Sequence, residues 1–232
     1  MSPPQQRRPR AGGRVPPSAG FPPIAGSRAT ILILGSLPGQ KSLEMGQYYA
    51  QPQNGFWRIM GALFGAGPSL PYAARLERLI ACGVAVWDVL AAGERAGSLD
   101  SAIVSASAVG NDFAEFFERH REIRRVCFNG TKAAQLYKRL VMPTLVPQVA
   151  ALDTRLLPST SPAHAARPFA AKLALWSAAL SAAAPGASAD RVAEPLAAGS
   201  PRSTLRSTDS EDGRVGASRA MPERRRVPRR RA

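Results

Sequence analysis

Four aliphatic residues, Ile31 to Leu34, pass directly into the loop Gly35-Ser36-Leu37-Pro38-Gly39. An unbroken aliphatic run of this length is typical of a strand that is buried on both faces. The glycines leave the backbone N–H groups of the loop open to a close approach by a ligand. This stretch therefore predicts a parallel sheet with a binding loop at the carboxyl end of its first strand.

The rest of the chain alternates short apolar runs with amphipathic segments. Further strands are expected where apolar residues follow one another, at 83–87, 125–128 and, more weakly, 144–146. Helices are expected where apolar residues recur with helical spacing, at 56–64, 72–81, 113–117, 131–140 and 167–183. Strands that alternate with helices form a parallel sheet with helices on both faces. The chain is therefore expected to be an α/β protein.

Polar residues stand where the predicted strands end. They are the loop 35–39, Asp88, Asn129 and the segment Ser159 to Ser161. Ligands of such sheets bind at the carboxyl ends of the strands, so we expect these four groups to form one site. Asp88 has a second interpretation, as the cap of a helix that begins near Val89.

Between the first loop and the helix at 56–64 the chain gathers Tyr48, Tyr49, Asn54 and Phe56. Flat rings and a short amide at the end of a strand are suited to a planar polar ligand. Each ring could instead be an ordinary core residue, and Asn54 could cap the helix that follows it.

The charge of the chain is strongly positive, with 31 Lys and Arg against 16 Asp and Glu and a formal net charge of +15. Residues 20–183 hold 16 of the basic and 10 of the acidic residues, and the remainder lie in the two ends. The ends have little to bury, so we expect disordered basic tails at 1–19 and 185–232 around one folded domain at 20–184. The expected partner is a polyanion, most commonly nucleic acid, with an anionic membrane surface as the alternative.

Several classes of protein are disfavoured by what the sequence lacks. Its two cysteines, Cys82 and Cys127, lie among apolar residues and are expected to be reduced core thiols, too few for an iron–sulfur cluster. No apolar run reaches the roughly 20 residues that span a bilayer, and the N-terminus lacks the apolar segment of a secretory signal. We expect a soluble, cytoplasmic monomer without metal or cofactor.

Three motifs resemble those of the uracil-DNA glycosylase superfamily, in particular its hypoxanthine (deoxyinosine) glycosylase branch. They are GSLPGQKSL at 35–43, QYYAQPQNGFW at 47–57 and LPSTSPAHA at 157–165. The resemblance covers about residues 21–183 and is supported by GVAVWDVL, AGSLDSAI, NDF and FNG. It implies a three-layer α/β/α fold with a central four-stranded parallel sheet. It also implies cleavage of the bond between a damaged base and deoxyribose.

Three positions depart from the pattern of many relatives. Ser36 and Leu37 stand where those relatives have an Asp or Asn that activates water. Leu157 stands where they have a His that stabilises the leaving base, and Gln51 replaces a His expected before Pro52. In the hypoxanthine branch the catalytic residue is instead the Asn of the YYxxPxNxFW motif. The resemblance therefore assigns catalysis to Asn54.

Roles for the remaining residues follow from the resemblance and from the chemistry of base removal. The target nucleotide must be flipped out of the duplex, and aromatic rings then stack on it. We expect Tyr49 to stack on the base, with Tyr48 and Phe56 as alternatives, and Asn54 to orient water. Asp88 only accepts hydrogen bonds when ionised, so it would favour the ring N–H of hypoxanthine or uracil over adenine or cytosine. The expected base-binding residues are Gly35, Ser36, Tyr49, Phe56, Asp88 and Asn129. The expected DNA-binding residues are Lys41, Ser42, Ser159, Thr160, Ser161 and His164, and His164 has an equal interpretation as a structural residue.

Other functions stay open at this point. A non-catalytic protein that binds damaged or single-stranded DNA would keep the same cavity. A nucleotide-binding α/β module is disfavoured because GSLPG matches neither GxGxxG nor GxxxxGK[ST]. Lys41 could form a Schiff base, but a loop lysine beside glycines more commonly contacts phosphate. We therefore expect a monofunctional glycosylase that acts on double-stranded DNA, with single-stranded DNA as a further candidate.

Overall fold

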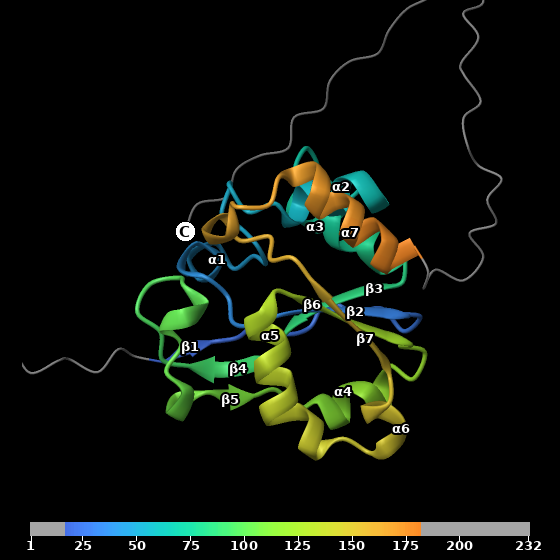
Figure 1. The fold of residues 1–232 in the computed structure, drawn as a ribbon. Coiled ribbons are helices and arrows are strands. Elements are labelled where there is room, and N and C mark those ends of the chain that lie inside the picture. Colours follow the sequence, from blue (N-terminus) through green and yellow to red (C-terminus); the bar gives the residue numbers. More distant parts are fainter. Residues whose placement is uncertain (1–16, 182–232) are drawn as a thin grey trace, which may run out of the picture. The chain divides into compact units, whose positions relative to one another are not determined.

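The computed structural model describes residues 17–181 (Figure 1). All of them belong to one compact structural unit, Met1–Asp190. The tails expected at 1–19 and 185–232 lie outside the described residues, apart from the end of the first. There, Ser18–Ala19 forms the short strand β1.

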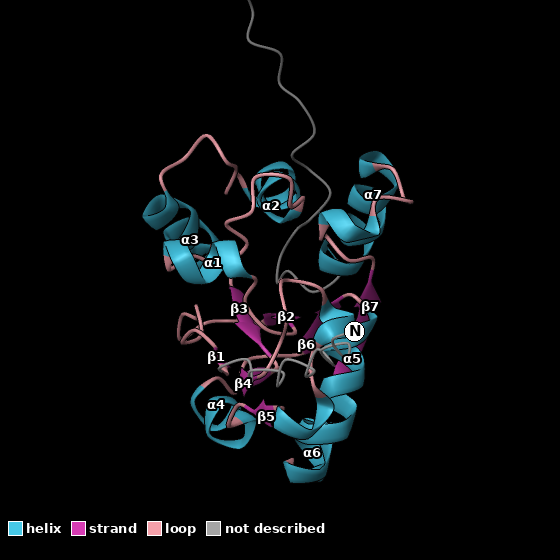
Figure 2. Cartoon of the chain, turned by 90° about the vertical axis from the view of Figure 1, so that its left-hand side faces the viewer, coloured by secondary structure: helices cyan, strands magenta, loops and turns pink. Residues whose placement is uncertain are grey.

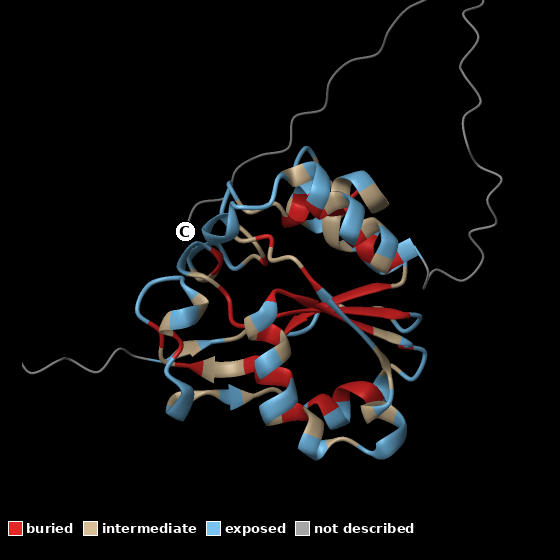
Figure 3. Cartoon of the chain, in the orientation of Figure 1, coloured by how far each residue is buried: buried red, intermediate tan, exposed pale blue. Residues whose placement is uncertain are grey.

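Four parallel strands form the central sheet, in the order β3-β2-β6-β7. They are β2 (Ile31–Gly35), β3 (Val84–Asp88), β6 (Arg125–Asn129) and β7 (Asp153–Leu157). Every residue of β2 and β3 is buried, as Figure 3 shows in red. The continuous apolar runs of these strands thus lie between two covered faces. The predicted four-stranded parallel sheet is confirmed.

The fourth strand does not lie where the sequence predicted it. Residues Met142–Thr144 form a 3₁₀ turn and Pro147–Ala150 forms the helix α6, so no strand runs through 144–146. Pro143 and Pro147 lack the N–H that a strand donates within a sheet. The true fourth strand, β7, lies at the edge of the sheet with three exposed residues, so its sequence contains no long apolar run.

Helices cover both faces of the sheet and give the three layers that were predicted (Figures 1 and 2). One face carries α2 (Phe56–Phe64), α3 (Tyr72–Ala81) and α7 (Phe169–Ser181). The other carries α4 (Phe113–Arg119), α5 (Thr131–Leu136) and α6. The helix expected at 131–140 consists of α5 and a π-helical turn, Tyr137–Val141. Among residues 17–181, no helix has the length and apolar character needed to cross a membrane.

A second sheet is antiparallel and has the strand order β1-β4-β5. Its other strands are β4 (Leu90–Gly93) and β5 (Val109–Gly110). Only Val89 separates β3 from β4. Val89 N donates to Gly35 O at 2.9 Å and Leu90 N donates to Ser36 O at 3.1 Å, so the chain stays beside the end of β2. No helix begins near Val89, so Asp88 is not a helix cap.

Aromatic rings pack on both faces of the parallel sheet. Trp87 of β3 contacts Phe113 and Phe116 of α4 at centroid distances of 4.8 and 4.9 Å. On the opposite face, Phe56 of α2 meets Trp176 of α7 at 6.2 Å. Because these rings are buried and closely packed, the loops at the carboxyl edge of the sheet start from fixed points.

The two cysteines differ in their surroundings. Cys127 is buried in β6, and burial raises the pKa of its thiol to about 12. Cys82 is exposed, because it follows the last turn of α3 where the chain lies at the surface. The prediction that both thiols lie in the core is therefore wrong for Cys82.

Candidate active site

A cavity of about 650 Å³ opens at the carboxyl edge of the parallel sheet. Its walls include the ends of β2, β3 and β6 together with parts of the segments 36–39, 48–54, 95–101 and 159–164. Every site residue predicted from the sequence lines it except Phe56. The polar groups at the strand ends therefore do lie together, around a space of the size that holds a small molecule.

Asp88 lies at the end of β3 and is only 3% exposed. Its Oδ2 atom has no hydrogen-bond partner among the described residues. Burial raises the pKa of this carboxyl from 3.8 to about 7, aided by the negative charge of Asp100 and opposed by Arg95. Asp88 is thus a residue of the cavity wall with one carboxyl oxygen that no described group hydrogen-bonds, and its burial favours the neutral form of the carboxyl.

Gly35 makes room for that carboxyl. A Cβ atom on Gly35 would overlap Asp88 Oδ1 and would lie 3.0 Å from the Tyr49 hydroxyl oxygen. Any larger residue at this position would push both polar groups aside. The first glycine of the loop is therefore needed for close approach and not only for flexibility.

Tyr49 has an uncommon backbone conformation, with φ of 54°, the one positive value among the described residues other than glycine. Its ring is stacked on Phe56, with centroids 3.9 Å apart and planes inclined by 20°. Its hydroxyl is buried and no described group meets it with hydrogen-bonding geometry. Burial raises the pKa of this phenol, and so does the neighbouring Asp88. Tyr49 is therefore part of the cavity wall, and its hydroxyl lies near Asp88 and Asn129.

The other two aromatic candidates have different surroundings. Phe56 is fully buried behind Tyr49 and meets Trp57 and Trp176 edge to face, so no base can stack on it. Its prediction as a base-contacting residue is corrected to a support for Tyr49. The Tyr48 hydroxyl donates a hydrogen bond to Phe21 O at 3.3 Å or to Pro22 O at 3.2 Å. Its polar end is therefore occupied by the backbone and not available to a base.

Asn54 lies in the cavity wall just before α2. Its Oδ1 accepts a hydrogen bond from Phe56 N at 3.0 Å, and its own backbone N–H donates to Gln51 O at 2.8 Å. The cap of α2 is Gly55, so Asn54 is not the helix cap considered from the sequence but the residue before it. The contact with Phe56 N uses one lone pair of Oδ1 and neither hydrogen of Nδ2, so most of the amide is available to a ligand.

Asn129 and Thr160 hold one another. Asn129 Nδ2 donates to Thr160 Oγ1 and Thr160 N donates to Asn129 Oδ1, both at 2.9 Å, and both residues are buried. Thr160 O also accepts from Gly55 N at 2.9 Å. The prediction of Thr160 as a DNA-binding residue is therefore corrected: its side chain is buried, and the residue links Asn129 to Gly55. Asn129 has only part of its amide left for a base.

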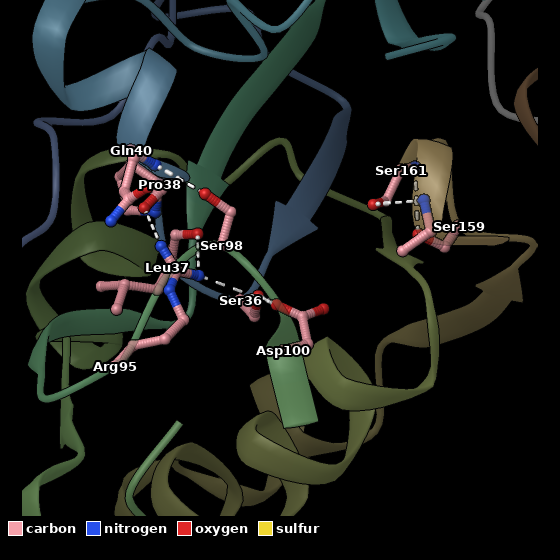
Figure 4. Close-up of polar contacts among 10 residues, drawn as sticks. Ser36, Leu37, Pro38, Gln40, Arg95, Ser98, Asp100, Ser159 and Ser161 are labelled. Carbon is pink, nitrogen blue, oxygen red and sulfur yellow. Dashed lines mark hydrogen bonds and ion pairs between the residues drawn. The ribbon is translucent and has the colours of Figure 1, made fainter. Parts of the chain in front are cut away.

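The remaining DNA-binding candidates divide into rim and interior. Lys41 and His164 lie at the exposed rim, where Lys41 Nζ pairs with Glu44 Oε2 at 3.2 Å. Ser159 and Ser161 are half-buried, and Ser161 N donates to Ser159 Oγ at 3.2 Å (Figure 4). Ser42 is 6% exposed and its Oγ accepts from Ala50 N at 3.2 Å, so it supports the segment before Asn54 and is unsuited to contact DNA.

Sequence reasoning missed two buried cations of the site. Lys172 lies on α7 and donates from Nζ to Ser159 O at 2.7 Å and to His164 O at 2.8 Å, which fixes both ends of their loop. Its one signal in the sequence is a lone lysine within the apolar run 169–180. Arg95 lies in the wall near Asp88 and has no such signal, since it follows Glu94 in a polar loop. Among residues 17–181, no cluster of three or more His, Cys, Asp or Glu could hold a metal ion.

Together, the fold and the cavity define an α/β protein with a cavity at the carboxyl edge of a parallel sheet. The chain matches the family model of the uracil DNA glycosylase superfamily over residues 22–200. It belongs to the uracil DNA glycosylase superfamily, as its motifs indicated.

Relatives in archaea extend this result. The chain is 38% identical over 146 residues to the hypoxanthine DNA glycosylase of Methanosarcina acetivorans, covering 62% of this chain and 87% of the relative. It is 39% identical over 117 residues to the hypoxanthine DNA glycosylase of Methanosarcina barkeri, covering 50% and 73%. A solution NMR structure from Methanosarcina acetivorans, described as a candidate uracil DNA glycosylase, shares 35% identity and a TM-score of 0.57. That match covers 70% of this chain and 95% of that chain.

Proposed function

We propose that this protein is a DNA glycosylase that hydrolyses the bond between hypoxanthine and deoxyribose. Its similarity to two proteins named hypoxanthine DNA glycosylase supports the proposal. The observation that carries it is the buried Asp88 carboxyl in the cavity wall, with Oδ2 unpartnered among the described residues. A buried polar atom without a partner costs free energy, so an atom of this kind in a residue of the cavity wall supports a ligand that completes it.

Asp88 and hypoxanthine are complementary in their hydrogen bonds. The base presents a ring N–H beside a carbonyl oxygen, and an ionised carboxylate accepts from that N–H. Adenine presents a lone pair at the same nitrogen, which would face the carboxylate oxygen without a proton between them. The difference disfavours the normal base by leaving buried groups unpaired. Uracil presents the same N–H and carbonyl pair and is a second substrate under this proposal.

The base reaches the cavity after the nucleotide is flipped out of the duplex. Hypoxanthine does not pair as its parent adenine does, which lowers the cost of flipping. Tyr49 then offers its ring to the base, for roughly 1–3 kcal/mol of stacking. Phe56, stacked on Tyr49 at 3.9 Å, holds that ring in place.

Asn54 would orient the attacking water through its amide. When the glycosidic bond breaks, its electron pair leaves with the base, and the water oxygen bonds to the sugar carbon and then releases a proton to the surrounding solvent. An amide is too weak a base to take that proton early. The reaction would instead pass through a sugar cation that the phosphates of the DNA stabilise.

The departing base gains negative charge that must be accommodated. Leu157, 4% exposed, offers no donor at the position where many relatives have a His. Asp88 can donate a hydrogen bond when it is neutral, and its pKa of about 7 allows that form at physiological pH. The ionised carboxyl would recognise the base, and after taking a proton from solvent the neutral carboxyl would donate a hydrogen bond to the departing base.

The test is single-turnover excision from a labelled duplex that contains one deoxyinosine. Free hypoxanthine should be released together with an abasic site that breaks only after treatment with alkali, as for a monofunctional glycosylase. A strand break without alkali would indicate a lyase. Binding with a preference for inosine duplexes but without release of the base would indicate the non-catalytic alternative. A parallel duplex with deoxyuridine determines whether uracil is also removed.

A further inference from the structure

Arg95 is a buried arginine in the loop that follows β4, with 4% of its surface exposed. Its guanidinium donates from Nη1 to Leu37 O at 3.1 Å and from Nη2 to Pro38 O. Its Nε–H has no hydrogen-bond partner among the described residues. One side chain thus joins the loop after β4 to the first loop of the cavity (Figure 4).

Two neighbours of Arg95 extend this connection. Asp100 Oδ1 accepts from Ser36 Oγ at 2.5 Å, and Ser98 Oγ accepts from Gln40 N at 3.0 Å. Figure 4 shows these contacts side by side, with Arg95 beneath Leu37 and Pro38. The 95–100 segment therefore holds the first loop along most of its length.

The charge of Arg95 is only loosely neutralised. Its Nη1 lies 3.9 Å from Asp100 Oδ1, at the limit of an ion pair, while the same Asp100 oxygen accepts a short hydrogen bond from Ser36 Oγ. Burial lowers the pKa of the guanidinium, and the charges of Asp100 and Asp88 counteract that lowering. Burying a cation costs free energy that two carbonyl contacts offset only in part. Its field therefore acts on other groups in the cavity, where screening by water is weak.

Asp88 is the titratable group that this field reaches. The charged and titratable groups that face it are Tyr48 and Tyr49 from one segment, and Arg95 and Asp100 from another. The two phenols are neutral at physiological pH because burial raises the pKa of each. Burial is the largest influence on the pKa of Asp88, and the two charges that adjust it come from one positive and one negative side chain of the same short loop.

We propose that Arg95 is a positioning residue that, with Asp100, locks the 36–38 part of the first loop against the cavity and sets the charge that Asp88 carries there. The effect on Asp88 is a property of the free protein. Only its consequence for base excision rests on the proposed function.

The experiment follows the Asp88 carboxyl by carbon-13 NMR during a pH titration of the free protein, with Asp88→Asn identifying the signal. Arg95→Met removes the positive charge, so the pKa of Asp88 should rise by about one pH unit or more. Asp100→Asn removes the negative charge but keeps an oxygen for Ser36, so the pKa should fall by a similar amount. A purely structural role gives no reason for opposite shifts.

Two further variants complete the test. Arg95→Lys keeps the charge and should leave the titration of Asp88 nearly unchanged. Arg75→Met is the matched control, because Arg75 also donates to two backbone carbonyls, Leu70 O at 2.8 Å and Pro68 O at 2.9 Å, away from the cavity. If Arg95→Met does not fold, Asp100→Asn and Arg95→Lys still decide between the outcomes. Unchanged titration in Asp100→Asn, or an equal shift in Arg75→Met, would overturn the proposal.

Excision from an inosine duplex gives the second readout. Arg95→Met should lose at least about 10-fold in single-turnover rate and shift the pH midpoint that depends on Asp88. If wild-type protein removes no base, the proposed function fails while the titration still tests the role of Arg95. If excision is present but the titration shows no opposite shifts, the role of Arg95 fails alone.

Discussion

Replacing Asp88 by Asn should stabilise the protein at alkaline pH while it damages excision. The folded pKa of Asp88 is raised, from 3.8 to about 7. Between those two pH values the folded protein holds a proton that the unfolded chain has lost, so stability falls as pH rises through this window. At about 1.36 kcal/mol for each pH unit, the full difference is about 4 kcal/mol, an upper limit that applies above pH 7.

The asparagine variant resembles the protonated form and does not titrate. It should therefore match the wild type near pH 4 and exceed it by up to about 4 kcal/mol at pH 8, a rise in melting temperature on the order of 10 °C. Urea unfolding of both proteins at several pH values measures the difference. The acidic end of the series is an internal control, because there the two side chains are alike in charge.

The same variant should lose discrimination between inosine and adenine in single-turnover excision. An asparagine can present either a donor or an acceptor to the base, so the repulsion of adenine is removed. If the two proteins show parallel stability across the whole pH range, the carboxyl is not held in a buried and unpaired state. If stability behaves as expected but substrate ratios do not change, Asp88 does not read the base.

Three other substitutions test separate parts of the site. Asn54→Ala should lower the single-turnover excision rate by about 100-fold or more, with little change in affinity for an inosine duplex. Gln53→Ala, at an exposed neighbour, should leave the rate unchanged. Near wild-type rates in Asn54→Ala would remove Asn54 from the mechanism. Gly35→Ala should lower the excision rate at least about 10-fold, because its Cβ would overlap Asp88 Oδ1. Gly39→Ala should be tolerated, because its Cβ would lie at an ordinary 3.5 Å from Ser98 Oγ. Equal excision rates in the two variants would contradict the need for a glycine beside Asp88. Lys172→Met removes two hydrogen bonds to loop carbonyls, so it should lower the free energy of unfolding in urea by about 2–3 kcal/mol and weaken duplex binding. Lys138→Met, at an exposed lysine, is the control. Unchanged binding in Lys172→Met would show that the loop does not need this lysine.

The sequence predicted the fold well where its pattern reflects burial. The strands β2 and β3 are buried at every residue, and their apolar runs were unmistakable. The helices α2 and α3 begin and end where the periodicity placed them. The edge strand β7 was misplaced because exposed residues give it no such pattern. Local pattern thus identifies elements in the core and misses those at the edge.

For the candidate site, the motifs gave the neighbourhood of each residue but not its orientation. Tyr49 and Phe56 stand in one motif, yet only Tyr49 lines the cavity. Thr160 lies in a loop that suggested contact with DNA, but its side chain is turned inward to Asn129. Arg95 acts through carbonyl oxygens far away in the chain, and no local spacing encodes such a contact. These details depend on packing between distant segments.

The hydrogen bonds of Thr160 connect the 159–164 loop to the start of α2. Its carbonyl holds Gly55, the neighbour of Asn54, while its side chain and N–H hold Asn129 at the end of β6. A force applied to the 159–164 loop is thus passed through one residue to the start of α2. A displacement of this loop should therefore shift the Asn54 amide as well, because both ends of the connection are fixed by hydrogen bonds to Thr160.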